Sequence, residues 1–147
     1  MRAARKCRSV MYPPQRLTFK PACVPGNLLE EIALTVDEYE AIRLADYEEL
    51  EHEGAAKRMN ISRPTFTRLI KKARNKIAIF LIECRRLEIS GGNFHFASDI
   101  VQCHDCGAYI RHAITQKTTI CPHCGSKNVE SMAEKLGHGD CCRDKEE

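Results

Sequence analysis

Two pairs of cysteines have the spacing of metal ligands. Cys103 and Cys106 form one CxxC pair, Cys121 and Cys124 form another, and fourteen residues separate the pairs. Each pair is followed by glycine, which permits the tight turn that brings two thiolates together. Four thiolates in a tetrahedron suit Zn²⁺, and iron is the less favoured alternative. The spacing therefore predicts a four-cysteine metal site.

A strand-forming segment connects these two pairs. Residues 108–119 are rich in β-branched and aromatic side chains, which predicts a β-hairpin between the two cysteine turns. The module resembles a zinc ribbon. Its Cys-Pro-x-Cys-Gly form also resembles rubredoxin, an iron protein, but the loop is shorter and the aromatic core is missing. Four thiolates leave no open position on the metal, which argues against hydrolytic chemistry and for a structural or contact role.

The remaining cysteines lack metal spacing. They are Cys7, Cys23, Cys84, Cys141 and Cys142. We expect Cys84 to be a small buried hydrophobe. The polar end of the chain, which contains Cys141 and Cys142, is either a flexible tail or a second metal or redox site. The basic N-terminus is not followed by an apolar stretch, so we expect a cytoplasmic protein, in which nine cysteines favour metal ligation over disulfides.

A second candidate for chemistry is the basic stretch of residues 61–74. Ser62 is suited to begin a helix because its hydroxyl can accept a hydrogen bond from a first-turn amide, and Pro64 is tolerated in that turn. One side of the helix is apolar, with Phe66, Leu69, Ile70, Ala73 and Ile77 at helical spacing. The other side carries Arg63, Thr67, Lys71 and Arg74. Such a helix either enters a DNA major groove or is an amphipathic helix whose charges are only solvated.

The preceding residues favour the DNA interpretation. Thr35 to Glu38 has the pattern of a capping box, which predicts a helix over residues 35–46. A shorter helix follows over residues 51–59, and its Ala55 and Ala56 permit a close helix crossing. Asn60 tolerates the left-handed backbone that a tight turn requires. These elements predict a helix-turn-helix, whose second helix covers residues 62–83.

The chain resembles two known groups of proteins in this region. Residues 34–46 and 55–63 look like region 4 of bacterial sigma factors, which recognises the −35 promoter element. Residues 1–95 resemble the UPF0251 (DUF134) family more closely, through Arg5-Lys6-Cys7-Arg8, Phe19-Lys20-Pro21, Leu34-Thr35-Val36-Asp37-Glu38, Ile42-Arg43-Leu44-Ala45-Asp46, Ser62-Arg63 with Thr65-Phe66, and Gly91-Gly92. The resemblance implies a DNA-binding domain without naming target genes. Glu51 replaces the usual capping Ser and Gly54 replaces a helix former, so the helix over residues 51–59 is expected to be frayed or short.

Charge is strongly segregated along the chain. Residues 1–29 carry six basic and no acidic residues, residues 30–53 carry ten acidic residues and one Arg, and residues 54–82 carry eight basic and no acidic residues. This asymmetry favours a polyanionic partner. Residues near the start of the second helix would contact base edges: Arg63, Thr65, Thr67 and Arg68. Flanking residues would contact phosphates: Lys57, Arg58, Lys71, Lys72 and Arg74.

The resulting prediction is a mainly α, sigma region 4-like helix-turn-helix domain followed by a small β zinc-ribbon module. Its parts are a basic, Pro-rich arm (1–29), the helix-turn-helix domain (30–90), a hairpin with the zinc ribbon (91–130) and a polar tail (131–147). The apolar end of the long helix would complete the core or join a homodimer. The expected function is sequence-specific binding of double-stranded DNA in transcriptional regulation. An iron redox protein and an adaptor for RNA polymerase or another protein are the alternatives. No enzyme motif and no membrane-spanning stretch are present.

Overall fold

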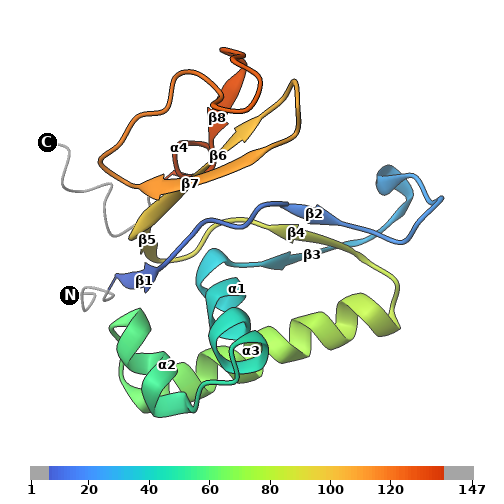
Figure 1. Ribbon diagram of the computed structural model, residues 1–147. Helices are drawn as coiled ribbons and strands as arrows, with labels where there is room; N and C mark the ends of the chain where they lie inside the picture. The colour runs from blue at the N-terminus through green and yellow to red at the C-terminus, as the bar shows by residue number, and fades with distance from the viewer. Residues whose placement is uncertain (1–6, 138–147) are drawn as a thin grey trace, which may run out of the picture.

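The structure, a computed structural model, describes residues 7–137. Within these residues, strands precede and follow a central group of helices, and the strands form three small sheets (Figure 1). β-Structure is not confined to the C-terminal part as the sequence predicted, because strands also precede the helices. No helix in this part of the chain is long and apolar enough to cross a membrane. Residues 1–6 and 138–147, including Cys141 and Cys142, lie outside the described part.

A mixed sheet frames the main helices. Strands β3 (Glu31–Leu34) and β4 (Arg86–Ile89) lie parallel, and the chain between them forms the helices α1 to α3. Strand β2 (Thr18–Phe19) pairs antiparallel with the other edge of β4, so this part of the basic arm packs on the domain. A single 3-10 turn, η1 (Gly26–Leu28), lies between β2 and β3. The helices are therefore a crossover connection of the sheet.

The first helix is shorter than predicted. Helix α1 (Val36–Ile42) begins with the predicted capping box, in which the Thr35 hydroxyl accepts a hydrogen bond from the Glu38 amide. The chain then continues as a π-helical stretch, η2 (Arg43–Tyr47), instead of the predicted α-helix to residue 46. The amide of Glu48 donates to the carbonyl of Arg43 at 2.9 Å, five residues back, which is the bonding pattern of a π-turn.

The next two helices follow the sequence pattern closely. Helix α2 (His52–Met59) ends at Asn60, whose φ of 58° is left-handed as predicted. Helix α3 (Arg63–Ile82) begins after Ser62, whose hydroxyl accepts from the Thr65 amide at 3.3 Å. Glu51, which replaces the usual capping Ser, makes no side-chain hydrogen bond to the start of α2. Local signals therefore determined both helix ends at this turn.

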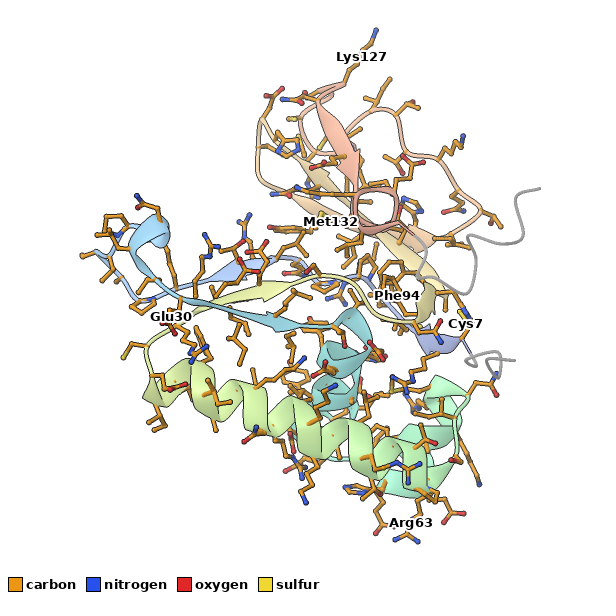
Figure 2. All side chains as sticks on the ribbon, turned by 180° about the vertical axis from the view of Figure 1, so that it is seen from behind. Cys7, Glu30, Arg63, Phe94, Lys127 and Met132 are labelled. Atoms are coloured by element: carbon orange, nitrogen blue, oxygen red, sulfur yellow. The ribbon has the colours of Figure 1, made fainter. Side chains whose placement is uncertain are left out.

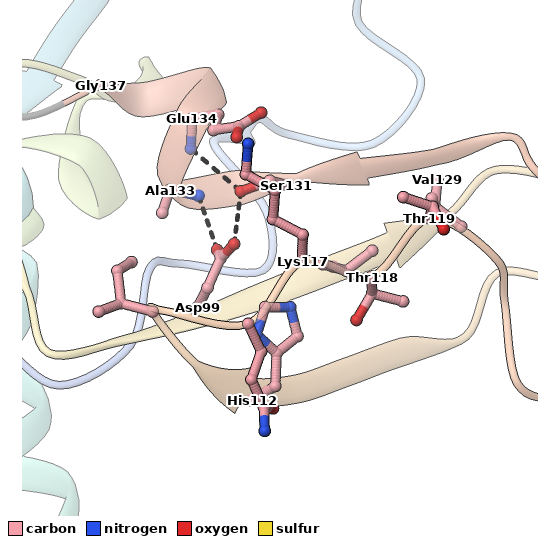
Figure 3. Close-up of a pocket in the computed structure, with 13 residues that line it drawn as sticks. Asp99, His112, Lys117, Thr118, Thr119, Val129, Ser131, Ala133, Glu134 and Gly137 are labelled. Atoms are coloured by element: carbon pink, nitrogen blue, oxygen red, sulfur yellow. Dashed lines mark hydrogen bonds between the residues drawn. The ribbon is translucent and has the colours of Figure 1, made fainter.

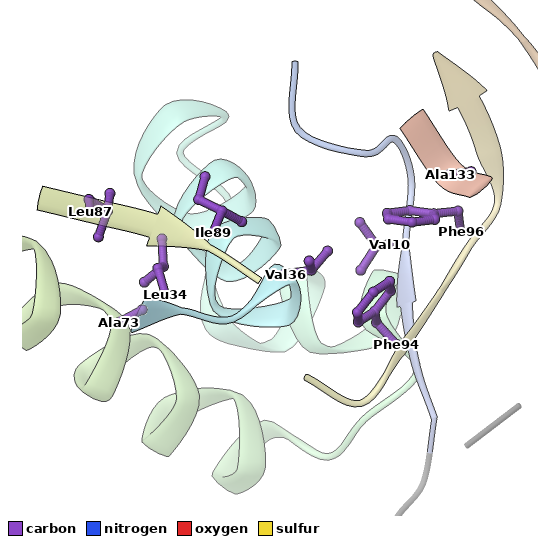
Figure 4. Close-up of a cluster of buried hydrophobic side chains, with 9 residues drawn as sticks. All are labelled: Val10, Leu34, Val36, Ala73, Leu87, Ile89, Phe94, Phe96 and Ala133. Atoms are coloured by element: carbon purple, nitrogen blue, oxygen red, sulfur yellow. The ribbon is translucent and has the colours of Figure 1, made fainter. Parts of the chain in front are cut away.

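The helices and sheets enclose two apolar clusters. One lies among α1, η2, α2 and α3 and contains Ala55, Ala56, Met59 and Phe66, all fully or almost fully buried. The other joins the mixed sheet and α1 to residues close to both ends of the described part of the chain, Val10 and Ala133 (Figure 4). Its buried members are Val10, Leu34, Val36, Ala73, Leu87, Ile89, Phe94, Phe96 and Ala133. The small side chains in the first cluster let the helices cross closely, as expected.

The chain around residues 8–10 belongs to this core. Strand β1 (Arg8–Val10) pairs parallel with β5 (Phe94–Phe96), and Val10 is completely buried. Part of the predicted arm is therefore a strand of the fold. Residues 87–96 alternate around a glycine turn, which predicts a hairpin, but this prediction is wrong because β4 pairs with β2 and β3 while β5 pairs with β1. The two strands have distant partners that local sequence does not reveal.

The C-terminal sheet is antiparallel, with β6 (Ser98–Cys103) between β7 (Tyr109–Ala113) and β8 (Val129–Ser131). The hairpin predicted within residues 108–119 is wrong, because β7 pairs with the preceding strand β6. A short helix, α4 (Met132–Leu136), follows β8. Asp99 is buried at the junction, where it accepts hydrogen bonds from the Ser131 hydroxyl and the Ala133 amide (Figure 3).

The end of α3 divides between core and surface. Ile77 and Phe80 pack against the second cluster, whereas Leu81 and Ile82 are exposed by 64% and 82%. Cys84 was predicted to be buried, and this is wrong: its side chain is exposed and its φ is 53°. The helix has already ended at Glu83, so residue 84 lies in the turn toward β4 and not on the apolar stripe.

Three carboxylates at the start of α1 are almost completely buried, and each is paired with a cation. The pairs are Asp37 with Arg8, Glu38 with Lys76, and Glu40 with Arg43. Lys76 lies in α3 and Arg8 lies in β1, so the charges connect α1 to two distant elements. The loop before β5 approaches the same place, because the Val36 amide donates to the Gly91 carbonyl at 3.0 Å.

Two glycines should respond to substitution in opposite directions. A Cβ on Gly92 would lie 2.3 Å from Oδ1 of Asp37, and its φ of 109° strains any other residue. Gly92→Ala should therefore destabilise the protein by at least about 2 kcal/mol. A Cβ on Gly54 meets nothing within 4 Å, so Gly54→Ala should stabilise α2 by up to about 1 kcal/mol. Urea unfolding of both variants tests this, and equal stabilities would contradict the role given to Gly92.

Candidate metal centre and basic helix face

The four-cysteine site consists of two turns with the same hydrogen bonds. In the first, the Gly107 amide donates to the Cys103 carbonyl at 3.0 Å, and in the second the Gly125 amide donates to the Cys121 carbonyl at 2.8 Å. Both glycines have positive φ, 77° and 74°, which explains why glycine follows each CxxC pair. Local turn chemistry thus directs the two thiols of each pair toward the same side.

The two turns bring all four predicted ligands together. The sulfur atoms of Cys103, Cys106, Cys121 and Cys124 all lie within 4.8 Å of one another. Across the turns, the Cys103 and Cys124 sulfurs are 3.6 Å apart, and the Cys106 and Cys121 sulfurs are 3.7 Å apart. Sulfur atoms at about 2.3 Å from a tetrahedral metal lie at comparable separations. The four cysteines can therefore hold one metal ion.

Backbone amides and neighbouring sulfurs set the acidity of these thiols. The backbone N–H of Cys106 lowers the pKa of Cys103 to about 7. The backbone N–H of Ser126 lowers the pKa of Cys124, but burial and three adjacent thiols outweigh this effect and together raise that pKa to about 12. Four thiols at this separation cannot all ionise without a cation between them. A metal ion supplies that charge, which fits the donor set.

Asp105 connects the two turns. Its carboxylate accepts hydrogen bonds from the Ser126 hydroxyl and from the Asn128 side chain, and these two donors lower the pKa of Asp105. The His104 amide also donates to the Asn128 carbonyl at 2.9 Å. This role was not predicted from the sequence, although an acid inside the first CxxC pair and polar residues after the second pair are a signal for it. Such contacts orient the ligands of metal sites.

The predicted DNA-contacting residues lie on one accessible region of α2 and α3. All are exposed except Thr65, which is partly buried at the start of α3 and whose hydroxyl is 2.7 Å from that of Ser62. The exposed residues are Lys57, Arg58, Arg63, Thr67, Arg68, Lys71, Lys72 and Arg74. The opposite face of α3 is buried, with Phe66, Leu69, Ile70 and Ala73 inside. The predicted amphipathic pattern is therefore present.

Some of these side chains already have partners. Arg74 forms a two-point ion pair with Asp46 at 2.6 and 3.1 Å, and Arg58 lies 3.6 Å from Glu48. The Thr67 hydroxyl is 3.0 Å from Nδ1 of His52, a contact that the sequence did not suggest. Among residues 7–137, no ion pair forms at the remaining cations: Lys57, Arg63, Arg68, Lys71 and Lys72.

The two sites lie at opposite ends of the molecule. Figure 2 shows Arg63, at the start of α3, far from Lys127, which lies just after the last cysteine of the four-cysteine module. The N-terminal segment and β5 run between the two ends (Figure 1). The four-cysteine module therefore cannot position the start of α3 by direct contact.

Metal binding should release protons and weaken at low pH. Ligation requires thiolates. The pKa of Cys106 and that of Cys124 are both raised, so these thiols are protonated in metal-free protein at pH 7.5. We expect one Zn²⁺ per chain with release of about two or more protons, and a falling affinity as pH falls below 7. Calorimetry in buffers of different ionisation enthalpy measures the protons. Cys121→Ser should weaken binding strongly while Cys23→Ser should not, and equal affinities of the two variants would refute the ligand set.

A family model and individual relatives of the chain point to the same protein family. The family described as "Protein of unknown function DUF134" matches residues 1–97. A UPF0251 protein of Chloroherpeton thalassium is 50% identical over 125 residues, which are 85% of this chain and 83% of that protein. A UPF0251 protein of Moorella thermoacetica is 42% identical over 137 residues, 93% of this chain and 90% of its own length, so the match includes the four-cysteine segment.

No solved structure matches the chain. The family profile covers well over half of the sequence, and the relatives align with it over most of their own lengths. The resemblance noted from residues 1–95 is therefore confirmed. The chain belongs to the DUF134 family of UPF0251 proteins.

Proposed function

We propose that the protein is a sequence-specific DNA-binding protein that regulates transcription in the cytoplasm. In this proposal α2 and α3 form a helix-turn-helix, and α3 enters the major groove of double-stranded DNA. The four-cysteine module, a zinc ribbon, holds structural Zn²⁺. The names of the two relatives reported above state no function, so the proposal rests on the chain's own residues.

The observation that carries the proposal is the unneutralised charge on one face of α3. Arg63, Arg68, Lys71 and Lys72 are exposed and form no ion pair with any described residue, although ten acids lie in residues 30–53. Several of these acids pair with basic residues outside α3, for example with Arg8 and Arg43. A helix with cations on the open face can approach phosphates and base edges without first breaking internal pairs.

The turn before α3 supports this use of the helix. Asn60 in the left-handed conformation and the Ser62 cap end α2 and begin α3 within a few residues. The buried Ala55 and Phe66 fix the two helices against each other. In helix-turn-helix proteins the N-terminal residues of the second helix contact bases. Arg63, Thr65, Thr67 and Arg68 occupy those positions here.

Residues farther along the helix have a different role. Lys71 and Lys72 lie one turn beyond these residues, where they would contact phosphates, together with Lys57 of α2. We expect Arg74 to contribute less to DNA binding, because a DNA phosphate would have to compete with its two-point ion pair with Asp46. Arg58, with a longer contact to Glu48, remains available.

The DNA targets can be found by selection. Purified full-length protein would be incubated with fragmented genomic DNA from its source, and bound fragments would be sequenced after washing at increasing salt. A shared sequence motif supports the proposal. Recovery of random fragments alone, or of none at low salt, would contradict it and would favour an adaptor that binds RNA polymerase or another protein.

Two substitutions should separate the proposed roles. Arg63→Ala should reduce preference for the selected site over random DNA by about 1–3 kcal/mol. Lys71→Ala should weaken binding to the selected site and to random DNA alike, and should reduce the slope of log affinity against log salt concentration by about 0.9. Lys127→Ala, with the same charge change at the far end of the molecule, is the control. Fluorescence anisotropy at several salt concentrations measures these effects, and identical behaviour of the Arg63 and Lys71 variants would contradict the assignment.

The metal's identity has a direct test. Zinc held by four thiolates is colourless, whereas iron in the same site absorbs visible light. The visible spectrum and the metal content of protein purified without added metal therefore distinguish a structural zinc module from an iron redox centre. The proposal requires a colourless protein with about one zinc per chain.

A further inference from the structure

A second charged region lies away from the face of α3, in a cavity between the two halves of the molecule. Its volume is about 570 Å³, which is in the range of small-molecule sites. The walls come from residues 11–19, from α1 and η2, from Arg58 of α2, and from strands β6 and β7. Its lining includes tyrosines and arginines: Tyr12, Arg16, Tyr39, Tyr47, Arg58 and Arg111.

Positive charge exceeds negative charge in this cavity. The lining contains four arginines and one carboxylate, that of Glu48. Arg43 is fully engaged, with contacts to Glu40 at 2.6 Å and to Glu48 at 2.7 Å. Arg58 has only the 3.6 Å contact to Glu48 and is half exposed. This longer contact leaves its guanidinium free to turn toward another anion.

The other two arginines have no acidic partner among residues 7–137. Arg111 lies over the ring of Tyr12, with its Cζ 5.2 Å from the ring centroid, and Arg16 lies over the ring of Tyr109 at 5.5 Å. Stacking holds a guanidinium in place while its N–H groups stay directed outward. A positioned guanidinium with free donors is well suited to a phosphate group.

The cavity also offers aromatic surface. Tyr47 is 84% exposed, so its ring is free to accept a planar ligand. Tyr39 is partly buried beside it, and burial raises the pKa of Tyr39, which keeps its hydroxyl protonated. That hydroxyl makes no hydrogen bond to any described residue and can donate one to a ligand. Exposed tyrosines are good platforms for nucleobases.

We propose that this cavity binds a nucleotide. The phosphates lie against Arg16, Arg58 and Arg111, and the base stacks on Tyr47. An inorganic anion would use the arginines and leave the tyrosines without a role, whereas an uncharged aromatic ligand would leave the guanidiniums unneutralised. A nucleotide combines both chemistries in one ligand of suitable size. The nucleotide is either free in solution or part of a single strand of nucleic acid, and the test distinguishes these sources.

The inference stands apart from duplex binding by α3. The cavity shares only Arg58 with the residues assigned to DNA contact, and Arg63 lies outside its lining. Loss of duplex binding in an Arg63 variant and loss of nucleotide binding in an Arg111 variant can therefore be measured separately. Either function can fail without the other.

The experiment uses full-length, zinc-loaded protein and calorimetric titration with ATP. Adenosine and tripolyphosphate, the two halves of that ligand, are titrated in parallel, and a labelled single-stranded oligothymidine is measured by anisotropy. ATP should bind more tightly than either half. Arg111→Gln and Arg16→Gln should each weaken binding about tenfold or more. Tyr47→Ala should weaken the binding of ATP but leave the affinity for tripolyphosphate unchanged. Arg63→Gln is the matched control and should keep the wild-type affinity for ATP.

The outcomes are distinct. Binding of oligothymidine but not ATP, lost in the Arg111 and Arg16 variants, identifies the ligand as a nucleotide within a strand. Failure of both probes to bind overturns the proposal. Equal affinity for ATP and tripolyphosphate overturns the role of the aromatic rings. Equal losses in the Arg63 and Arg111 variants show general attraction to basic surface and overturn the site. The variants lie on exposed positions, and unfolding curves check that each is folded.

Discussion

The arrangement of the helices depends on three buried carboxylates in the first turns of α1. Asp37, Glu38 and Glu40 are each at most 2% exposed, and burial without partners would be prohibitively unfavourable. Their cations come from β1, from α3 and from the residue after α1. Removal of one partner from such a pair generally costs about 3–5 kcal/mol, because the other charge remains buried. The need to neutralise these charges therefore restricts how β1 and α3 can lie against α1.

This constraint explains how an acidic segment can adjoin a basic helix without neutralising it. Three of the acids in residues 30–53, Asp37, Glu38 and Glu40, are directed inward. Their partners there are Arg8, Lys76 and Arg43. Within residues 7–137, Arg74 is the one α3 residue assigned to DNA that has an acidic partner, Asp46. The charge asymmetry along the sequence thus becomes a separation in space. An outer face of α3 remains positive because the inner charges are matched elsewhere.

The helical turn and the clustering of the four cysteines were predictable because their determinants are local. Asn60, Ser62 and the Thr35 capping box act within a few residues, and each CxxC turn is complete in five. The strands were not predictable in the same way, since β1 pairs with β5 and β2 with β4, across most of the chain. Both predicted hairpins were wrong because alternation and a glycine turn indicate strands but not their partners. Cys84 was misplaced because the helix ended before it.

The segment after β1 gives the two ends of the molecule a physical connection. The Ala97 and Ser98 amides donate to the carbonyls of Val10 and Met11, which ties this segment to the start of β6, while the Met11 amide reaches the buried Glu40. The arginine- and tyrosine-lined cavity lies along the same segment. A ligand there would contact α1, η2 and β7 together. Since binding stabilises whichever arrangement makes the contacts, a nucleotide would favour one placement of the four-cysteine module relative to α3.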